Sequence, residues 1–230
     1  MVLPLLLLKE RSINKDKPYL ASFVQRLGRI TSAQKEALKL LDRFKLIDET
    51  QLLGFASDYK KVILDIGFGN GESTVYIANS NPEALVVASE VYKSGIGSLL
   101  GSIVENSIGN IKIFDKDIRE LLLKISTSIF DEIYIICPDP WPKARHHKRR
   151  LLNKDFLEIL HRTIQPNGTI YISTDWKHYA EFIEEAIHDS SKKFEYNKTP
   201  QRGLPITRFQ QRAINEGRAI HTYLLEALKK

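Results

Sequence analysis

The stretch KKVILDIGFGNG, residues 60–71, decides the fold. A short apolar run leads directly into Gly67, Gly69 and Gly71, and a helical pattern begins at Glu72. Glycines at alternate positions permit a tight turn and let the backbone approach a ligand closely. The stretch therefore predicts a strand, a ligand-binding turn and a helix, in that order.

The alternation of strand and helix continues toward the C-terminus, which is the pattern of a parallel sheet in an α/β fold. Further strands are predicted at ALVVASE (84–90), NIKIF (110–114), DEIYIIC (131–137), TIYIST (169–174) and within 218–227. Helices are predicted at 33–44, from 72, from 93, near 118, at 156–164, at 179–187 and at 207–216. Pro166-Asn167-Gly168 should end the helix that contains Ile164, and the chain between Phe194 and Thr207 is predicted to be loop.

The composition fits one large catalytic domain. The chain has 230 residues, of which 43% are hydrophobic, enough to bury a full core. Its net charge of +6 favours an anionic partner such as nucleic acid, and its single cysteine suits the reducing cytoplasm. The run MVLPLLLL at residues 1–8 lacks the pattern of a secretory signal and is too short to cross a membrane, so no membrane partner is expected.

Residues 1–34 are expected to form a mobile basic arm, and residues 35–230 a single domain. The arm contains Arg11, Lys15, Lys17, Arg26 and Arg29 without a sustained apolar period. Such an arm could bind RNA phosphates or simply be solvated.

Three acidic residues accompany successive predicted strands. Asp65 opens the glycine turn, Glu90 ends the second strand and Asp117 follows the third. Glu90 is placed to accept hydrogen bonds from ribose hydroxyls, and Asp117 to meet an adenine edge. A dinucleotide fingerprint would need a third glycine where Glu72 stands, and the charge of that residue would oppose a pyrophosphate, so NAD is disfavoured.

The run CPDPWPKARHHKRR, residues 137–150, follows the predicted strand DEIYIIC. Its prolines end the strand and exclude a helix, so Asp139 and Trp141 should be held on a stiff loop. Its last eight residues hold five Lys or Arg and two His, a density that a polyanion would neutralise. Because His146 and His147 lack the spacing of paired metal ligands, no metal is expected.

The pattern D-x-G-x-G-x-G at residues 65–71 resembles the first motif of S-adenosylmethionine-dependent methyltransferases. With RLGRITSAQKEAL, SEVY, PDPW-x-KARH-x-KRR, STDW and TRFQQRA, nearly the whole chain resembles the bacterial tRNA (guanine-N7-)-methyltransferase family. The resemblance implies a class I methyltransferase fold, with a seven-stranded, mostly parallel sheet and helices on both faces. It also implies methylation of the variable-loop guanosine of tRNA, at tRNA position 46, to 7-methylguanosine. The sequence does not distinguish a monomer from a homodimer.

The resemblance also implies roles for matching positions. The cofactor S-adenosylmethionine would be bound by Asp65, Gly67, Gly69, Gly71, Glu90, Asp117 and Asp139, with Asp139 also the catalytic residue. The target nucleotide would be contacted by Lys143, Asp175, Thr207, Arg208, Phe209 and Gln210. The rest of the RNA would be contacted by Arg145, His146, His147, Lys148, Arg149 and Arg150.

Three positions depart from the family pattern. Cys137 stands where a larger apolar residue is common, Pro142 where a polar one is, and Gln210 where glutamate ends the TxFE motif. An amide accepts hydrogen bonds less strongly than a carboxylate, so the last departure concerns how the guanine edge is held.

The chemistry of guanine N7 favours catalysis by positioning and electrostatics. N7 carries a lone pair at neutral pH and needs no strong general base, and Asp139 would stabilise the positive charge that develops on the purine. Asp175 could accept hydrogen bonds from guanine N1 and the exocyclic amine. Trp141 is expected either to stack on a base or ribose or to be a structural residue of the proline turn.

Three alternative functions fit the residues less well. Asp139-Pro140-Trp141 loosely resembles the acidic motif of amino-group methyltransferases. Cys137 could act in cysteine-dependent pyrimidine methylation, although no base is placed beside it in the sequence. From a different class, a non-catalytic RNA-binding protein could retain the methyltransferase fold.

Overall fold

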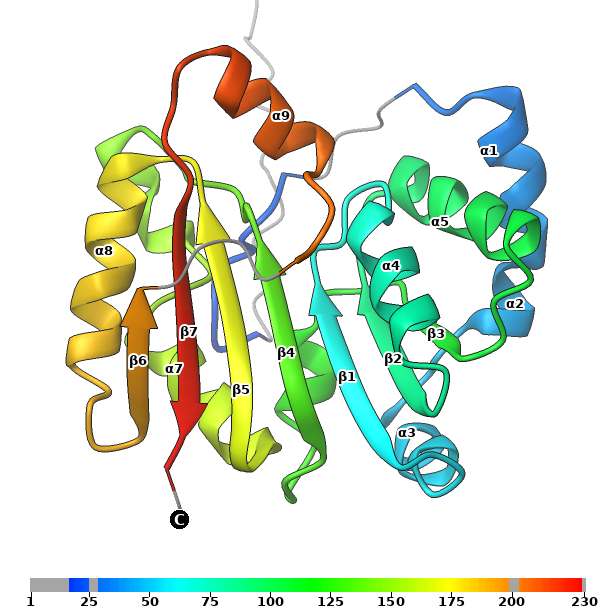
Figure 1. Ribbon diagram of the computed structural model, residues 1–230, viewed down its shortest axis with the longest axis horizontal. Coiled ribbons are helices and arrows are strands. Elements are labelled where there is room, and N and C mark those ends of the chain that lie inside the picture. Colours follow the sequence, from blue (N-terminus) through cyan, green and yellow to red (C-terminus); the bar gives the residue numbers. More distant parts are fainter. Residues whose placement is uncertain (1–16, 25–28, 199–202, 229–230) are drawn as a thin grey trace, which may run out of the picture.

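The fold is built on one seven-stranded sheet with the strand order β3-β2-β1-β4-β5-β7-β6 (Figure 1). The computed structural model describes residues 17–24, 29–198 and 203–228. All neighbouring pairs from β3 to β5 are parallel, whereas β7 runs antiparallel to both β5 and β6. The strands are β1 Lys61–Ile66, β2 Ala84–Ser89, β3 Ile111–Phe114, β4 Phe130–Ile136, β5 Ile164–Thr174, β6 Phe194–Lys198 and β7 His221–Ala227.

Helices cover both faces of this sheet (Figure 1). On one face lie α3 Glu49–Ala56, α6 Arg119–Leu122, α7 Lys154–Thr163 and α8 Lys177–His188. On the other lie α4 Glu72–Ser80 and α5 Lys93–Glu105. Helix α1, Ser32–Ala37, and a 3-10 turn, Leu38–Leu40, pack against α5, and α2, Leu41–Phe44, lies against β3. The seven-stranded, mostly parallel sheet with helices on both faces is confirmed.

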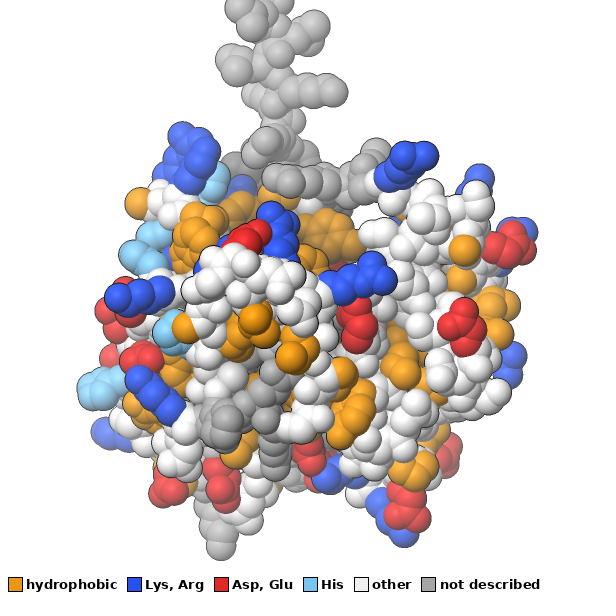
Figure 2. Space-filling view, turned by 45° about the horizontal axis from the view of Figure 1, so that its top comes forward, with side chains coloured by type: hydrophobic (Ala, Val, Ile, Leu, Met, Phe, Trp, Pro, Cys, Tyr) orange, Lys and Arg blue, Asp and Glu red, His pale blue; other side chains and the backbone are white. Residues whose placement is uncertain are grey.

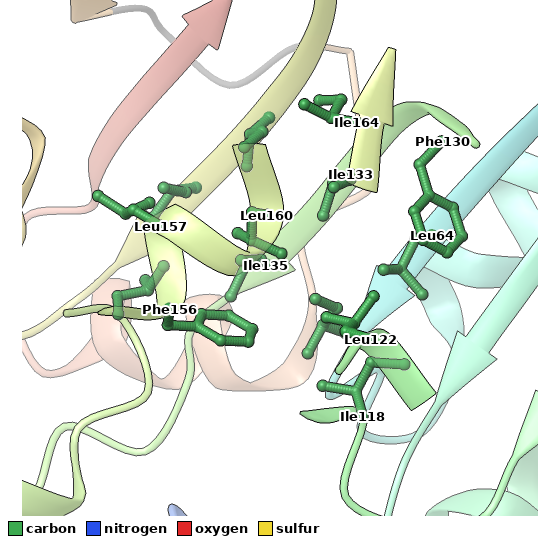
Figure 3. Packing of buried hydrophobic residues seen from close by; sticks show 14 of the residues in the cluster. Leu64, Ile118, Leu122, Phe130, Ile133, Ile135, Phe156, Leu157, Leu160 and Ile164 are labelled. Carbon is green, nitrogen blue, oxygen red and sulfur yellow. The ribbon is translucent and has the colours of Figure 1, made fainter. Parts of the chain in front are cut away.

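The larger of two apolar clusters lies between the sheet and α6, α7 and α8 (Figure 3). Phe156, Leu157 and Leu160 of α7 are at most 2% exposed and pack with Ile133 and Ile135 of β4. Full burial of such a side chain contributes about 1.5–3 kcal/mol to the free energy of unfolding. This cluster fixes the end of β4, from which the proline-rich loop departs.

Helix starts follow the capping chemistry of the sequence. Thr31 accepts from the backbone N–H of Gln34, whose side chain accepts from the N–H of Thr31, so a capping box starts α1. The helix predicted at 33–44 is confirmed in outline, but the 3-10 turn interrupts it. Asn153 caps α7 through a hydrogen bond to the backbone N–H of Phe156.

Two predicted elements differ from the structure. Helix α7 ends at Thr163, and Ile164 already belongs to β5, so Pro166-Asn167-Gly168 lies within a strand rather than at a helix end. The register shifts here, and Asn167 takes a left-handed conformation with φ of 62°. Strand β6 was predicted as loop, because only its first residue, Phe194, is buried and the other four carry no apolar alternation.

Part of the expected basic arm lies outside the described residues, including Arg11, Lys15 and Arg26. Residues 17–24 are described, and they lie against the domain rather than apart from it. Within the described part of the chain, no helix is long and apolar enough to cross a membrane.

Candidate active site and its basic loop

A cavity of about 350 Å³ opens where the carboxyl ends of β1, β2 and β4 meet. Strand order reverses around β1, and ligands of open α/β sheets bind at such a switch point. Sequence-predicted residues from six separate segments line this one cavity: Gly67, Gly69, Glu90, Asp117, Asp139, Asp175, Thr207 and Phe209. The sequence therefore predicts part of the cavity wall.

The remaining predicted residues do not line the cavity. Asp65 and Gly71 lie behind its wall, and Gln210 is buried in the start of α9, Arg208–Asn215. Lys143 and Arg208 are exposed beside the cavity, in the proline-rich loop and in α9. Residues 143–150, here called the basic loop, include the short 3-10 helix Ala144–Arg149. The predicted RNA contacts in the basic loop are Arg145, His146, His147, Lys148, Arg149 and Arg150.

The glycine turn needs the freedom that glycine provides. Gly67, Gly69 and Gly71 have φ of 71°, 61° and 92°, in the left-handed region that other residues rarely adopt. The turn is tied to the second strand, because the N–H of Gly67 donates to the carbonyl of Ser89 over 2.8 Å. The backbone is thereby held against the cavity, where a ligand can approach it closely.

Glu90 is fixed in the cavity by three backbone donors. It is 6% exposed, and its carboxylate accepts from the backbone N–H groups of Gly69, Val91 and Tyr92 at 3.0, 2.6 and 3.1 Å. Burial raises the pKa of Glu90, and these three donors partly offset the rise. A carboxylate has about four lone-pair positions. One position is therefore left for a ligand hydroxyl.

Asp65 supports the turn from behind. It is 1% exposed, and one carboxylate oxygen accepts from the Thr74 hydroxyl at 2.7 Å. Burial raises the pKa of Asp65 to about 7, the Thr74 hydrogen bond opposes this, and the charge of Glu90 adds to it. Asp65 thus connects the end of β1 to helix α4.

We expect Asp65→Asn to change how stability depends on pH. Because the folded pKa is raised, ionised Asp65 costs folding free energy, and stability is lost as pH rises from about 4 to about 7. Asparagine stays neutral and can still accept from Thr74. The stability of Asp65→Asn relative to the unmodified chain should therefore rise by up to about 1.4 kcal/mol per pH unit between pH 5 and 7. Denaturant titrations across this range measure it, and a pH-independent difference would contradict the buried charge.

Asp117 is held by a neighbour that sequence reasoning missed. Arg119 donates to both carboxylate oxygens of Asp117, with Nε to Oδ1 at 2.9 Å and an NH2 contact to Oδ2 at 2.7 Å. Both side chains are at most 8% exposed. Only the spacing Asp-x-Arg in the sequence could have pointed to this buried ion pair, which keeps Asp117 in place at the cavity wall.

The proline-rich loop after β4 presents Asp139. Cys137 and Trp141 take φ of 49° and 46°, unusual for residues other than glycine, and they flank Pro138-Asp139-Pro140. Such conformations cost on the order of 1–3 kcal/mol each and persist where surrounding structure enforces them. Asp139 is exposed to solvent and lines the cavity.

Cys137 is chemically quiet. Burial raises the pKa of its thiol to about 12, and the charge of Asp175 adds to the rise. Since the thiolate is the nucleophilic form, Cys137 is poorly suited to attack a pyrimidine. Cysteine-dependent methylation is therefore not supported.

Arg150 departs from its predicted role in RNA binding. It is 1% exposed, and its guanidinium donates to the carbonyl oxygens of Pro140 and His178 and lies 4.9 Å from the ring centre of Tyr179. These contacts tie the proline-rich loop to α8. Arg150 is a structural cation, because none of its charge faces a phosphate-accessible surface.

The other cations of the basic loop fall into two groups. Arg149 is half-buried, lies 5.2 Å from the ring centre of Trp141 and donates to the carbonyl of Ala21. Exposed cations of the loop are Lys143, Arg145 and Lys148. Figure 2 shows Lys and Arg side chains projecting around the upper part of the face that carries this site.

The two histidines of the loop are half-buried. The ring centres of His147 and His178 lie 4.8 Å apart with the ring planes tilted by 44°, and the ring of His146 meets that of Trp141 edge-on with the centres 5.5 Å apart. Trp141 is likewise half-buried, and its indole N–H donates to the carbonyl of Ser22. Of its two expected roles, this geometry favours the structural one.

Gln210 also differs from its expected role at the guanine edge. It is 1% exposed and forms a capping box with Thr207, whose N–H donates to Gln210 Oε1 at 3.0 Å. Glutamine and glutamate both serve at this position of a capping box. The substitution of glutamine for the usual glutamate is therefore compatible with starting α9, and the amide does not face the cavity.

The remaining residues of α9 lie at the cavity mouth. Phe209 is 58% exposed, lines the cavity and lies over Gly69 of the glycine turn. Arg208 forms an ion pair with Glu72 over 3.4 Å, which joins the start of α9 to the start of α4. An exposed aromatic ring at the mouth is a platform on which a base can stack.

Asp175 is fixed by Arg218, another residue that sequence reasoning missed. Arg218 Nε and an NH2 contact both reach Asp175 Oδ2, at 3.1 and 2.8 Å. Arg218 precedes β7, more than forty positions beyond Asp175, so no local signal connects them. The pair holds the Asp175 carboxylate at the cavity wall.

Comparison with known proteins agrees with this geometry. A family model described as "Putative methyltransferase" matches residues 59–223. The chain is 37% identical over 222 residues to the tRNA (guanine-N(7)-)-methyltransferase of Nitrosococcus oceani, covering 93% of both chains. The chain belongs to the tRNA (guanine-N(7)-)-methyltransferase family.

Further members of this family give the same result. The Nitrosospira multiformis protein is 36% identical, covering 86% of this chain and 90% of the relative. The Nitrosomonas europaea protein is 38% identical, covering 88% and 94%. The resemblance found in the sequence motifs is confirmed.

Solved structures agree on the fold. The crystal structure of the 16S rRNA methyltransferase KamB superposes with a TM-score of 0.58 at 16% identity, covering 81% of this chain and 96% of that one. The structure of TrmN from Thermus thermophilus gives a TM-score of 0.52 at 16% identity, covering 85% of this chain and 48% of that one. The class I methyltransferase fold expected for the family is thus confirmed.

Proposed function

We propose that this protein transfers a methyl group from S-adenosylmethionine to N7 of the variable-loop guanosine of tRNA, forming 7-methylguanosine. The observation that carries the proposal is the convergence of Glu90, Asp117, Asp139 and Asp175 on one cavity beside a basic loop. Carboxylates suit a cofactor that carries an ammonium and a sulfonium, and the exposed cations suit the RNA backbone.

The cavity wall fits the proposed cofactor. Glu90 has one lone-pair position left after its three backbone donors, which can accept a ribose hydroxyl. Asp117 is fixed by Arg119 at the end of β3, where the base of a nucleoside lies in folds of this type. The close approach of the glycine turn leaves room for a flat, extended molecule along the strand ends.

Asp139 is proposed as the catalytic residue. S-adenosylmethionine supplies an electrophilic methyl group, which the N7 lone pair accepts as the carbon–sulfur bond breaks and the sulfur leaves as a neutral thioether. The guanine ring then carries the positive charge. A carboxylate at the position of Asp139 stabilises this charge as it develops, so the residue acts without removing a proton.

Asp175 is proposed to hold the guanine edge. Its carboxylate lines the cavity and is oriented by Arg218 through one oxygen, Oδ2. A carboxylate accepts from the guanine N1–H and the exocyclic amine together, a pair of donors that adenine does not offer. Phe209 stacks on the base at the cavity mouth.

The exposed part of the basic loop is proposed to bind RNA phosphates without reading sequence. Arg145→Ala with Lys148→Ala should weaken all tRNAs alike and lower the slope of log affinity against log salt by about two units. Filter-binding titrations over a range of salt concentrations measure both effects. Unchanged affinity at every salt concentration would show that Arg145 and Lys148 are solvated surface residues that do not bind RNA.

The decisive experiment maps the product. Purified protein is incubated with unmodified tRNA and labelled S-adenosylmethionine, and the labelled nucleotide is identified by digestion and mass spectrometry. Label at N7 of the variable-loop guanosine supports the proposal, and label on an exocyclic amine favours the amino-group alternative. Tight tRNA binding with neither methylation nor binding of S-adenosylhomocysteine would identify a non-catalytic RNA-binding protein.

A further inference from the structure

Residues 17–24 form a segment, here called the roof segment, that lies across the mouth of the cavity. Ser22 and Phe23 line the cavity although they are far in sequence from the glycine turn and the acids. Both residues are half-buried. The roof segment therefore contributes to the wall of a site that the sequence placed entirely within residues 65–210.

Three backbone carbonyls hold the roof segment, and each accepts from a side chain of another element. Trp141 Nε1 donates to the carbonyl of Ser22 at 2.9 Å, and an Arg149 NH1 donates to that of Ala21 at 3.2 Å. The Tyr92 hydroxyl donates to the carbonyl of Val24 at 3.0 Å. Two of these three donors, Trp141 and Arg149, belong to the run of residues 137–150 that follows β4.

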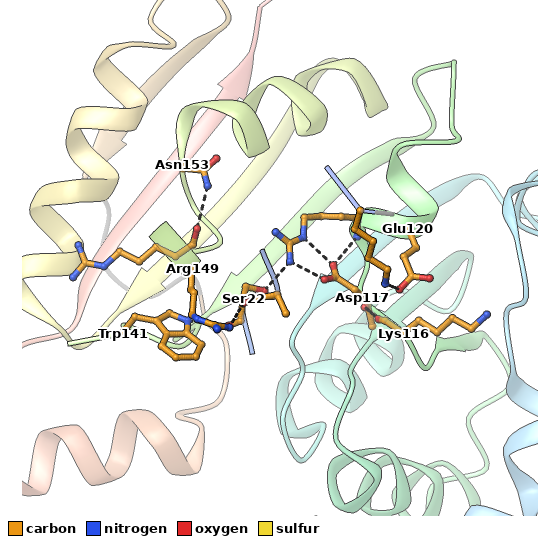
Figure 4. A network of polar contacts seen from close by, with 12 residues as sticks. Ser22, Lys116, Asp117, Glu120, Trp141, Arg149 and Asn153 are labelled. Atoms are coloured by element: carbon orange, nitrogen blue, oxygen red, sulfur yellow. Dashed lines mark hydrogen bonds and ion pairs between the residues drawn. The ribbon is translucent and has the colours of Figure 1, made fainter. Parts of the chain in front are cut away.

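The other side of the roof segment is attached to α6. The guanidinium carbon of Arg119 lies 3.8 Å from the ring centre of Tyr19, and Lys17 forms an ion pair with Glu120. Figure 4 shows Trp141 on one side of Ser22 and Asp117 and Glu120 on the other. The segment thus spans the cavity from the basic loop to the Asp117–Arg119 pair.

Trp141 and Arg149 belong to the loop assigned to RNA, yet neither lines the cavity. Any effect they have on a ligand in the cavity must pass through what they contact. Trp141 binds the carbonyl of Ser22, the residue before Phe23, and Arg149 binds the carbonyl of Ala21, two residues before it. Arg149 also lies over the Trp141 ring, so the two donors support one another.

We propose that Trp141 and Arg149 are positioning residues of the cofactor site, which hold the roof segment so that Ser22 and Phe23 cover the cavity. The inference rests on the proposed use of this cavity for S-adenosylmethionine. The basic loop then has a second function besides RNA binding, because it raises the affinity for the cofactor when no RNA is present. Exposed cations of the same loop, such as Lys148, have no part in this function.

Calorimetry of S-adenosylhomocysteine binding to the full chain without RNA tests the proposal. Trp141→Phe keeps the ring but removes the N–H, and Arg149→Met keeps the stem but removes the donor. Each should weaken binding about five-fold, the usual worth of one hydrogen bond. Lys148→Met, one residue from Arg149 and exposed, should stay within about two-fold of the unmodified chain.

A double variant separates positioning from general loss of stability. Phe23→Ala removes the covering side chain itself and should also weaken binding. If Trp141 acts by holding Phe23 in place, Trp141→Phe should have little further effect in the Phe23→Ala background. Fully additive losses, or single variants that bind as tightly as Lys148→Met, would overturn the proposal.

The outcome also distinguishes this inference from the proposed function. If the unmodified chain fails to bind S-adenosylhomocysteine, the assignment of the cavity is wrong. If it binds and the Trp141 and Arg149 variants bind equally well, only the positioning role is wrong. Melting temperatures of all variants show whether any has lost its fold.

Discussion

Replacing Asp139 with asparagine is expected to lower the rate of methyl transfer by on the order of 10² or more while tRNA affinity changes little. Asparagine keeps the size of the side chain and its place in the proline-rich loop, but it removes the negative charge at the cavity. N7 needs no deprotonation, so the lost term is the stabilisation of positive charge on the purine. The effect should therefore fall on the chemical step.

Single-turnover rates at saturating cofactor, with tRNA affinity measured separately, check this result. Asp175→Asn is the informative comparison, because a defect in holding guanine should raise the tRNA concentration required as well as slow the reaction. A near-native rate for Asp139→Asn would show that its charge does not act on the reaction. Asp139 would then be a residue that positions the cofactor.

Gly95→Ala is expected to weaken cofactor binding by more than ten-fold. Gly95 lies in the first turn of α5, and a Cβ added there would lie 2.1 Å from the carbonyl oxygen of Gly69 and 3.4 Å from Cγ of Glu90. Real Cβ atoms do not approach a backbone oxygen so closely, so the glycine turn or the helix must move. Either movement breaks the alignment of Gly69 with Glu90, and misplacement by about 1 Å can cost two orders of magnitude at such a site.

Gly101→Ala provides the matched control in the same helix. A Cβ at Gly101 meets nothing within 4 Å, and alanine favours a helix over glycine by about 1 kcal/mol. This variant should therefore bind S-adenosylhomocysteine normally and melt at a higher temperature. If Gly95→Ala also bound normally, the packing of α5 against the glycine turn would not govern the cofactor site.

Periodic and terminating signals explain why the fold was largely predictable. Strand β2 is a continuous apolar run, β1 and the second half of β4 are nearly so, and helices α7 and α8 carry clear apolar stripes, so local sequence and tertiary burial agree there. Strand β6 lacked such a signal, since its pairing with β7 rather than its own pattern makes it a strand. The early end of α7 likewise depends on the pairing of Ile164 with Phe130.

The site was predictable where acidic residues follow strands. It was not predictable where an acidic residue pairs with a cation far away in the sequence. Glu90, Asp117 and Asp175 stand at strand ends, which parallel topology brings together. Arg149 and Arg150 are adjacent in one basic run, but Arg150 is buried and Arg149 is only half-buried, so the two side chains contact different parts of the protein. The composition of the run does not predict this difference in burial. The partner of Asp175, Arg218, comes from a different part of the chain.

The position of β7 between β5 and β6 affects how the chain folds during its synthesis. On the ribosome, all other described strands emerge before His221–Ala227, so a nascent chain holds β5 with one open edge and β6 without its partner. Open edges invite pairing with other chains. Helix α9, whose Phe209 lies at the mouth of the cavity, emerges only shortly before β7. The sheet and the cavity are therefore completed almost together during translation. A chain truncated before β7 is expected to aggregate rather than to keep part of the activity.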